Sequence, residues 1–309
     1  MDDLVSVVVL TYNSENFIEQ TLDSILKQTY KNIEVIIADD CSRDNTVITA
    51  EKFFEGNDFN NFKIVKTEQN SGIPSNCNNG IRNSAGKFIK IIAGDDILLN
   101  ECILDNIKFC KKNNSKVQFS KVINFVEDNG KIMEIKSPYK YDKNNNKYDV
   151  KRQLYNMIFR NYIPAPTMFF NREIFNKHGL FNTKYKFFED YPMWIKLLCN
   201  GEKIYFLDKD TILYRQHSNS LSNSSEYLIN ERMFKDLKDF INNEVIDIIK
   251  KEKRYIYIYH KKLELFKMQY VINSGNKKGI YEKISKLYNF LDPLWLINKI
   301  KELKMWIYW

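Results

Sequence analysis

The stretch Ile89-Lys-Ile-Ile-Ala-Gly-Asp-Asp96 is a β-branched apolar run that ends in two adjacent carboxylates. Such a run, stopped by turn residues, is typical of a buried strand, and α/β sheets bind ligands beyond the carboxyl ends of their strands. Mg2+ and Mn2+ prefer oxygen ligands and often share carboxylates with substrate phosphates. The stretch therefore indicates a site for a metal and a phosphate-bearing molecule. A solvated turn is the alternative, since Gly-Asp-Asp is ordinary turn chemistry.

Strand-like and helix-like segments alternate over the first hundred residues. Apolar runs typical of strands are separated by single segments with helical spacing, which favours a mostly parallel sheet covered on both faces. The expected strands are 5–10, 33–38, 62–65 and 88–92, and the expected helices are 15–28, 46–54 and 75–83. The sequence thus predicts a doubly wound α/β domain. At one edge of it three polar clusters should face a single crevice: Thr11-Tyr12-Asn13, Asp39-Asp40 and Gly94-Asp95-Asp96.

Composition limits the compartment and the class of partner. The net charge of the 309 residues is +8, and all of it falls within 251–309, where 13 Lys and Arg face 5 Asp and Glu. A basic segment of this kind suits nucleic acid, an anionic membrane or plain solvent. The acidic start, Met1-Asp2-Asp3, fits no secretory signal, and no run is long enough to span a bilayer. Five scattered cysteines are expected to be reduced, which suggests the cytoplasm.

Motifs for several enzyme classes are missing. The segment Ala85-Gly-Lys-Phe88 lacks the Ser or Thr of a P-loop, and the sequence contains no GxGxxG, GxSxG or HExxH. Dehydrogenase, kinase, hydrolase and zincin functions therefore lose their support.

Several segments, in order along about 220 residues, resemble the family 2 glycosyltransferases with a GT-A fold. They are Val5-Ser-Val-Val-Val-Leu-Thr-Tyr-Asn13, Ser24-Ile-Leu-Lys-Gln-Thr-Tyr30, Glu34-Val-Ile-Ile-Ala-Asp-Asp-Cys-Ser-Arg-Asp-Asn-Thr46 and Ala93-Gly-Asp-Asp96. The resemblance implies a Rossmann-like sheet and an enzyme that transfers a hexose or N-acetylhexosamine with inversion. It also implies a UDP-sugar donor and Mn2+ or Mg2+ on the diphosphate.

The resemblance also assigns residues to the donor. Thr11, Tyr12 and Asn13 would line the nucleoside pocket, with Tyr12 against the base, although packing in the first turn is an alternative. Asp40 would accept a hydrogen bond from uracil while Asp39 shapes the loop, with helix N-capping as the alternative. Asp95 would sit near the ribose, and Asp96 would bind the metal. Gly72 and Asn78 belong to a segment similar to the family's glycine-containing loop and the helix after it, in which Cys77 stands where many members carry Arg.

Two further segments complete the implied site. In Glu189-Asp190 the resemblance makes Asp190 the general base, and Glu189 would help orient it or contact the acceptor. Acids that merely stabilise a helix N-terminus are the alternative. The segment Tyr214-Arg-Gln-His217 resembles the family's C-terminal signature, so His217 would bind the metal or contact the diphosphate, with a structural histidine as the alternative. Arg215 would pair with the donor phosphates, and a structural ion pair is equally compatible with it.

A change of character near 220–226 predicts a boundary between a catalytic domain, 1–222, and a basic, aromatic helical region, 223–309. In 294–309 apolar residues follow helical spacing among lysines, and Trp and Tyr are frequent, which indicates a helix lying on a membrane. This suits a peripheral enzyme on the cytoplasmic face of the inner membrane. Such an enzyme would use a polyprenyl-diphosphate-linked glycan acceptor to build polysaccharide, lipopolysaccharide or capsule. Packing within a helical subdomain or a homo-oligomer is the alternative, and no nucleic-acid ligand is expected.

Two other functions stay open at this point. A sugar nucleotidyltransferase shares the sheet and the metal but releases pyrophosphate. A catalytically silent GT-A module would bind glycan or scaffold an assembly complex, although intact Asp40, Asp96, Asp190 and His217 argue against it.

Overall fold

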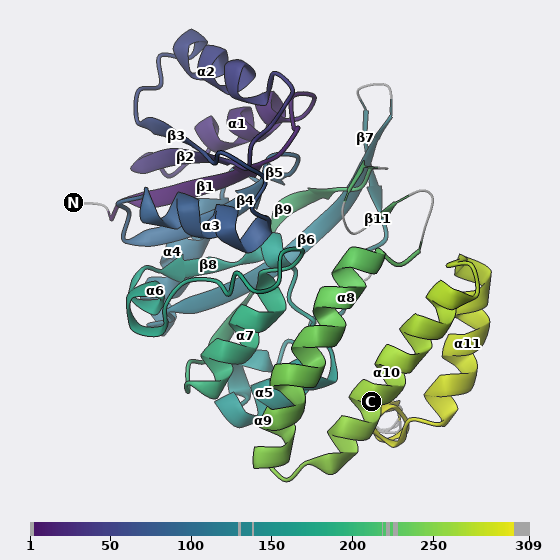
Figure 1. The fold of residues 1–309 in the computed structure, drawn as a ribbon. Coiled ribbons are helices and arrows are strands. Elements are labelled where there is room, and N and C mark those ends of the chain that lie inside the picture. The colour runs from purple at the N-terminus through teal and green to yellow at the C-terminus, as the bar shows by residue number, and fades with distance from the viewer. Residues whose placement is uncertain are drawn as a thin grey trace. The chain divides into compact units, whose positions relative to one another are not determined.

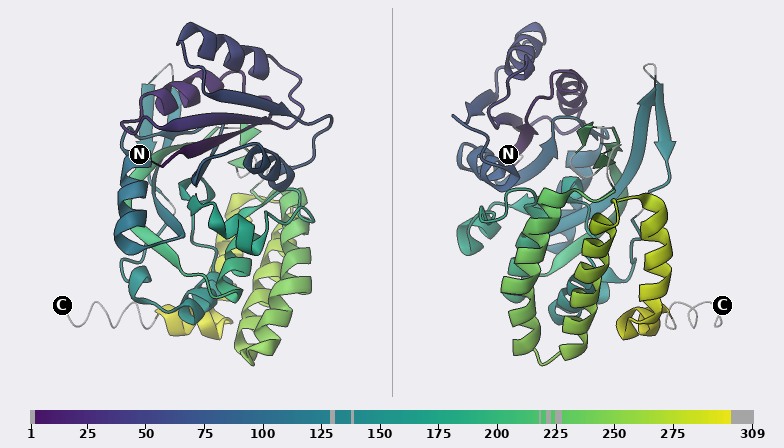
Figure 2. Two further views of the ribbon diagram at one scale, coloured as in Figure 1. Left: turned by 90° about the vertical axis from the view of Figure 1, so that its left-hand side faces the viewer. Right: turned by 45° about the vertical axis from the view of Figure 1, so that its right-hand side comes forward.

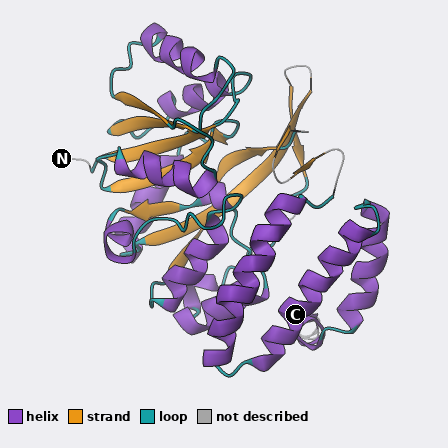
Figure 3. Ribbon diagram, viewed as in Figure 1, coloured by secondary structure: helices purple, strands orange, loops and turns teal. Residues whose placement is uncertain are grey.

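The structure is a computed structural model of the chain, and it describes residues 3–128, 131–137, 139–217, 219–220, 223–224 and 228–299. The chain divides into two compact units. The first comprises residues 1–157 and 161–216, and the second comprises 158–160 and 217–309. Figure 1 shows the elements along the chain, and Figure 3 separates helices from strands by colour.

The first half of the first unit alternates strands and helices as the sequence predicts. Its elements are β1 (Val5–Thr11), α1 (Ile18–Leu26), β2 (Ile33–Asp39), α2 (Thr46–Gly56), β3 (Phe62–Lys66), α3 (Ile73–Arg82) and β4 (Phe88–Ala93). The four strands are parallel, in the order β3-β2-β1-β4. Leu10 is in register with both Ala38 and Ala93, so β1, β2 and β4 end at the same edge.

The second half of this unit widens the same sheet. Its elements are β5 (Ile97–Leu98), α4 (Cys102–Asn113), β6 (Val117–Asp128), β7 (Lys131–Ile135), η1 (Asn145–Lys147), α5 (Val150–Phe159), η2 (Ala165–Thr167), β8 (Phe169–Asn171), α6 (Glu173–His178), α7 (Asp190–Cys199) and β9 (Ile204–Arg215). The sheet continues as β4-β8-β6-β9-β5, and β7 pairs with β6. Strand β8 is antiparallel to both neighbours, whereas β6 and β9 are parallel. The expected α/β architecture is confirmed.

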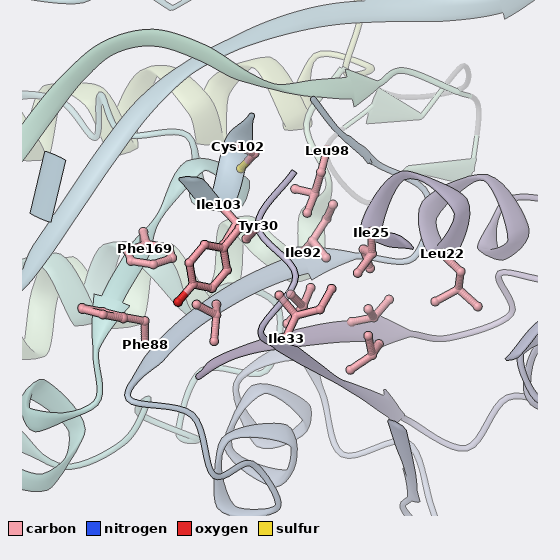
Figure 4. Close-up of a cluster of buried hydrophobic side chains, with 14 of the residues drawn as sticks. Leu22, Ile25, Tyr30, Ile33, Phe88, Ile92, Leu98, Cys102, Ile103 and Phe169 are labelled. Atoms are coloured by element: carbon pink, nitrogen blue, oxygen red, sulfur yellow. The ribbon is translucent and has the colours of Figure 1, made fainter. Parts of the chain in front are cut away.

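The core lies between the sheet and its helices because β1 and β2 are apolar on both faces. Val5, Val7 and Val9 are fully buried and pack with Ile18, Leu22 and Ile25 of α1. Figure 4 shows that this cluster extends through Ile92 and Leu98 to Phe88 and Phe169, side chains that lie far apart in the sequence. The cluster therefore fixes the strand ends on which the polar residues stand.

The second unit is mostly helical within its described residues. Its elements are β10 (Asn219–Ser220), β11 (Asn223–Ser224), α8 (Glu231–Phe240), the π-helical turn η3 (Ile241–Val245), α9 (Ile246–Lys251), α10 (Tyr255–Asn273) and α11 (Lys278–Phe290). Helices α8 and α9 form one rod through η3, and α10 lies between that rod and α11 (Figures 1 and 2). No helix among the described residues is long and apolar enough to cross a membrane. Most of the predicted surface helix 294–309 lies outside the described residues.

Candidate active site

The polar residues predicted at the strand ends lie together at one edge of the sheet. Asp40 N donates to Thr11 O at 2.9 Å, and Gly94 N donates to Leu10 O at 2.8 Å. These backbone hydrogen bonds join the segments that follow β1, β2 and β4. The three clusters are thus neighbours, as the parallel topology requires.

Asp39 supports the turn after β2. Its buried carboxylate accepts hydrogen bonds from Thr11 Oγ1 at 2.9 Å and from Ser42, through N at 2.9 Å and Oγ at 2.5 Å. Asn13 connects to the same turn, because its N donates to Ser42 Oγ and its Oδ1 accepts from Arg43 N, both at 2.9 Å. Asn13 has a φ of 52°, a left-handed conformation that Asn tolerates well. Together these contacts fix the backbone on either side of Tyr12.

Tyr12 differs from its neighbours in being exposed, with 48% of its surface accessible. Thr11, on the same turn, is buried, and its hydroxyl is used by Asp39. An aromatic ring held on a fixed turn and open to solvent is suited to stacking on a flat ligand such as a nucleoside base.

Asp40 holds the loop before α3. Oδ1 accepts from Thr67 Oγ1 at 2.9 Å and from Ser71 N at 2.8 Å, and Oδ2 accepts from Gly72 N at 2.9 Å. Gly72 is required here for two reasons. Its φ is 91°, and a Cβ would lie 2.7 Å from Lys186 O. Because Oδ2 has a single donor among the described residues, it keeps acceptor capacity for a ligand N–H.

Asp96 is the group in this cluster that most needs a further partner. Its Oδ1 accepts from Arg215 N at 3.0 Å, whereas Oδ2 is buried and has no hydrogen-bond partner among the described residues. Burial, followed by the charge of the Asp95 carboxylate, raises the pKa of Asp96 well above its usual range. A cation at Oδ2 would oppose both effects.

The donor set at Asp95 and Asp96 fits a hard divalent cation. Within the described part of the chain, no three His, Cys, Asp or Glu side chains gather into a metal cage. A cation here would therefore take most of its ligands from water and from substrate phosphates, as Mg2+ commonly does. His217, at the start of the main segment of the second unit, is partly buried.

Arg215 joins Asp95 and Asp96 to two other elements. Its side chain is 1% exposed; Nε donates to Asp95 O at 2.7 Å, Nη1 pairs with Glu127, and Nη2 donates to Gln20. The guanidinium also lies over the rings of Phe17 and Phe125, at 5.0 and 4.6 Å from their centroids. These contacts favour the structural ion pair over the donor contact.

Glu189 and Asp190 are two neighbouring carboxyl groups at the start of α7. Asp190 Oδ2 accepts from Asn161 Nδ2 at 2.8 Å. Burial and then the charge of Asp190 raise the pKa of Glu189 to about 8, and burial also raises the pKa of Asp190. Two interacting carboxyls of raised pKa can share a proton, which is the property expected of a general-base site.

Asn78 braces the segment that leads to this pair. Its Nδ2 donates to Phe181 O and its Oδ1 accepts from Phe181 N, both at 2.9 Å, and the side chain is buried. Cys77, beside it on α3, is buried within range of the Glu189 charge. Asn78 therefore connects α3 to the 181–189 segment in this structure.

A comparison with protein-family models matches residues 6–179 to "Glycosyl transferase family 2", which is more than half of the chain. The chain belongs to this family. The resemblance seen in the sequence is confirmed, and the protein is a glycosyltransferase.

Two bacterial proteins are among the relatives of this glycosyltransferase. One is Escherichia coli WfgD, "UDP-Glc:alpha-D-GlcNAc-diphosphoundecaprenol beta-1,3-glucosyltransferase", which is 27% identical over 80% of this chain and 91% of its own length. The other is Glycosyltransferase GlyG of Streptococcus pneumoniae, 26% identical over 72% of this chain and 73% of its own length.

Solved structures share the fold of this glycosyltransferase. S. aureus TarS 1-349 in complex with UDP-GlcNAc has a TM-score of 0.57 at 19% identity and covers 92% of this chain and 91% of its own. Mannosyltransferase PcManGT from Pyrobaculum calidifontis, in complex with GDP-Man and Mn2+, has a TM-score of 0.60 at 15% identity, covering 96% and 83%. At these identities the likeness establishes the GT-A fold alone.

Three residues of the glycosyltransferase site were not foreseen from the sequence. Glu127 and Gln20 hold Arg215, and Asn161 holds Asp190. None belongs to a motif, and each meets its partner through a sequence separation of 29 residues or more. Glu127 lies near Arg215 because β6 pairs with β9 and Phe125 is in register with Arg215. Knowledge of that pairing would have indicated Glu127 as its partner.

Proposed function

We propose that this glycosyltransferase moves a hexose or N-acetylhexosamine from a UDP-sugar to a lipid-linked glycan acceptor. The observation that carries the proposal is the buried Asp96 Oδ2, which has no hydrogen-bond partner in the described part of the chain and lies just beyond the carboxyl end of β4. Support for the donor comes from the names of WfgD and of the UDP-GlcNAc complex of TarS. Support for the acceptor comes from the diphosphoundecaprenol in the name of WfgD.

In the proposed donor site, Tyr12 stacks on uracil while Asp40 Oδ2 accepts its N–H. Thr11, Asn13, Asp39 and Gly72 keep that pocket in shape through the hydrogen bonds already described. Asn78 and Arg215 act on donor binding from a distance, through Phe181 and through Asp95.

Asp96 would hold the divalent metal, Mn2+ or Mg2+. When bound, this ion supplies positive charge that stabilises the diphosphate leaving group. Asp95 adds negative charge near it and contributes to the raised pKa of Asp96. The protein would thus supply carboxylate oxygen to the metal, and substrate phosphates would fill the other coordination positions.

Asp190 is the proposed general base. It takes the proton of the acceptor hydroxyl as the oxygen attacks the anomeric carbon, and the bond to the phosphate oxygen breaks with its electrons leaving on UDP. Attack opposite the leaving group inverts the anomeric centre. Asn161 orients the carboxylate, and Glu189 exchanges the proton with it.

The proposed setting is the cytoplasmic face of the inner membrane, during polysaccharide, lipopolysaccharide or capsule assembly. Residues 1–222 would be the catalytic domain, and 223–309 would attach it to the membrane surface or form a homo-oligomer.

A thermal-shift panel of UDP, GDP, CDP and TDP with and without Mn2+ tests the proposal, because a ligand that binds only the folded state raises its stability. We expect stabilisation by UDP that requires Mn2+. A response to another nucleotide would replace the donor, and no response to any nucleotide would favour a silent module.

A further inference from the structure

Exposed apolar side chains are concentrated in the helical unit. Of the fifteen large apolar side chains that are exposed within the described residues, ten lie between Leu228 and Ile297. Monomeric soluble domains rarely expose many such residues close together, so this concentration points to an unseen partner.

Helix α10 carries the most continuous part of this surface. Five of its exposed positions recur at helical spacing and so lie on one face: Tyr255, Tyr259, Lys262, Phe266 and Tyr270. The opposite side is already used inside the unit, where Leu265 and Val271 are buried. Tyr255 is 64% exposed and Phe266 is 55% exposed. We call this set the α10 face.

Helix α11 extends the apolar surface beside the α10 face. The rings of Phe266 and Tyr288 lie 5.7 Å apart, centroid to centroid, which links the two helices. Leu287 and Phe290 on α11 and Leu291 directly after it are exposed, and Phe290 reaches 70% exposure. The apolar surface therefore belongs to a helical hairpin.

The charge around this surface has one sign. Among described residues from 251 to 299, the exposed acidic side chain is Glu282, and the exposed basic side chains are Lys251, Lys253, Arg254, Lys262, Lys277, Lys283 and Lys299. A second copy of the chain would bring these like charges together, and lysine is depleted in protein interfaces. An anionic bilayer complements them, and tyrosine rings with flanking lysines are typical of helices that lie at a lipid interface.

We propose that the α10 face docks on an anionic lipid surface, with its aromatic rings at headgroup level and the surrounding lysines on the lipid phosphates. The inference rests on the proposed lipid-linked acceptor, because docking would bring the enzyme to the membrane that holds it. It concerns a surface other than the tail 294–309, so either one can bind lipid without the other.

The test is sedimentation of the full chain with vesicles of phosphatidylcholine alone or mixed equally with phosphatidylglycerol. We expect the wild type to bind the mixed vesicles. The double variant Tyr259→Ser with Phe266→Ser should bind them at least ~10-fold more weakly, because it lacks the two aromatic side chains that would be buried in the lipid interface. The matched control is Ile132→Ser with Met133→Ser, which removes two exposed apolar residues from β7 and should leave binding unchanged.

Two results would overturn the inference. One is undiminished vesicle binding by the α10 variant, which would assign the membrane contact to the tail. The other is concentration-dependent self-association that the same variant abolishes, without vesicle binding by the wild type, which would make a second copy the partner. UDP stabilisation of the same samples keeps the two proposals separate, because loss of nucleotide binding would contradict the proposed function and leave the lipid result standing.

Discussion

Glu127→Gln should destabilise the first unit and weaken donor binding, although Glu127 lies in no motif. The substitution keeps the shape of the side chain but leaves the Arg215 guanidinium, whose side chain is 1% exposed, without its carboxylate. Breaking a buried ion pair costs about 3–5 kcal/mol. Glu127 is 25% exposed, and Gln20, Asp95 O and two rings still contact Arg215. We therefore expect the free energy of unfolding to fall by about 2 kcal/mol, which is less than the cost of a fully buried pair.

Urea unfolding and thermal denaturation measure this loss. About 2 kcal/mol should lower Tm by roughly 4–8 °C in a domain of this size. Because Arg215 also holds Asp95 and Asp96, the KM for the donor and the Mn2+ concentration that gives half activity should rise. Glu134→Gln, on the exposed strand β7, is the control and should stay within about 0.5 kcal/mol of the wild type. Equal stability of Glu127→Gln and wild type would refute the claim that this ion pair supports the Asp95–Asp96 loop.

Three further substitutions test other parts of the site. Asp190→Asn should lower the transfer rate by about 10²–10⁴-fold while UDP stabilisation persists, and full turnover would contradict its role as base. Glu189→Gln should flatten the pH dependence of stability. The raised pKa of Glu189, about 8 against 4.5, means that the folded state holds an extra proton, so wild-type stability should fall as pH rises through that window. Wild-type stability that instead rises with pH between about 4.5 and about 8 would contradict the raised pKa of Glu189. Gly72→Ala should destabilise the protein by ~1–3 kcal/mol, because φ at this position is 91° and the new Cβ would lie too close to Lys186 O. Urea unfolding unchanged from the wild type would contradict this.

Much of the catalytic fold could be predicted because its signals are local. Alternating apolar runs and helical spacing determine β1 to β4, and the parallel order then brings Thr11, Asp40 and Asp96 to one edge. The antiparallel insertion of β8 between β4 and β6 was not foreseen, because three residues give no clear period. Lys90 shows the same limit. Nothing in the residue type of a lysine predicts burial, yet Lys90 is buried, with Nζ donating to Pro166 O at 2.5 Å.

The chemistry of the site was partly accessible from the sequence. Residue types in motifs identified the carboxylates, but their state depends on neighbours brought in by the fold. Asp96 is buried with Arg215 N on Oδ1 and no partner on Oδ2 among the residues described, and the raised pKa of Glu189 follows from burial beside Asp190. In the same way, the burial of Arg215 against Glu127 depends on a contact between β6 and β9 that no motif reports.

The measurement that tests the central claim most directly is UDP release from a panel of UDP-sugars, with a diphosphate-lipid-linked N-acetylglucosamine as acceptor. Reactions contain Mn2+ or a chelator and compare the wild type with Asp96→Asn and Asp190→Asn. We predict release by the wild type that depends on acceptor and on Mn2+ and is lost in both variants. Equal release by the wild type and both variants, or none by the wild type with any UDP-sugar, would contradict the account.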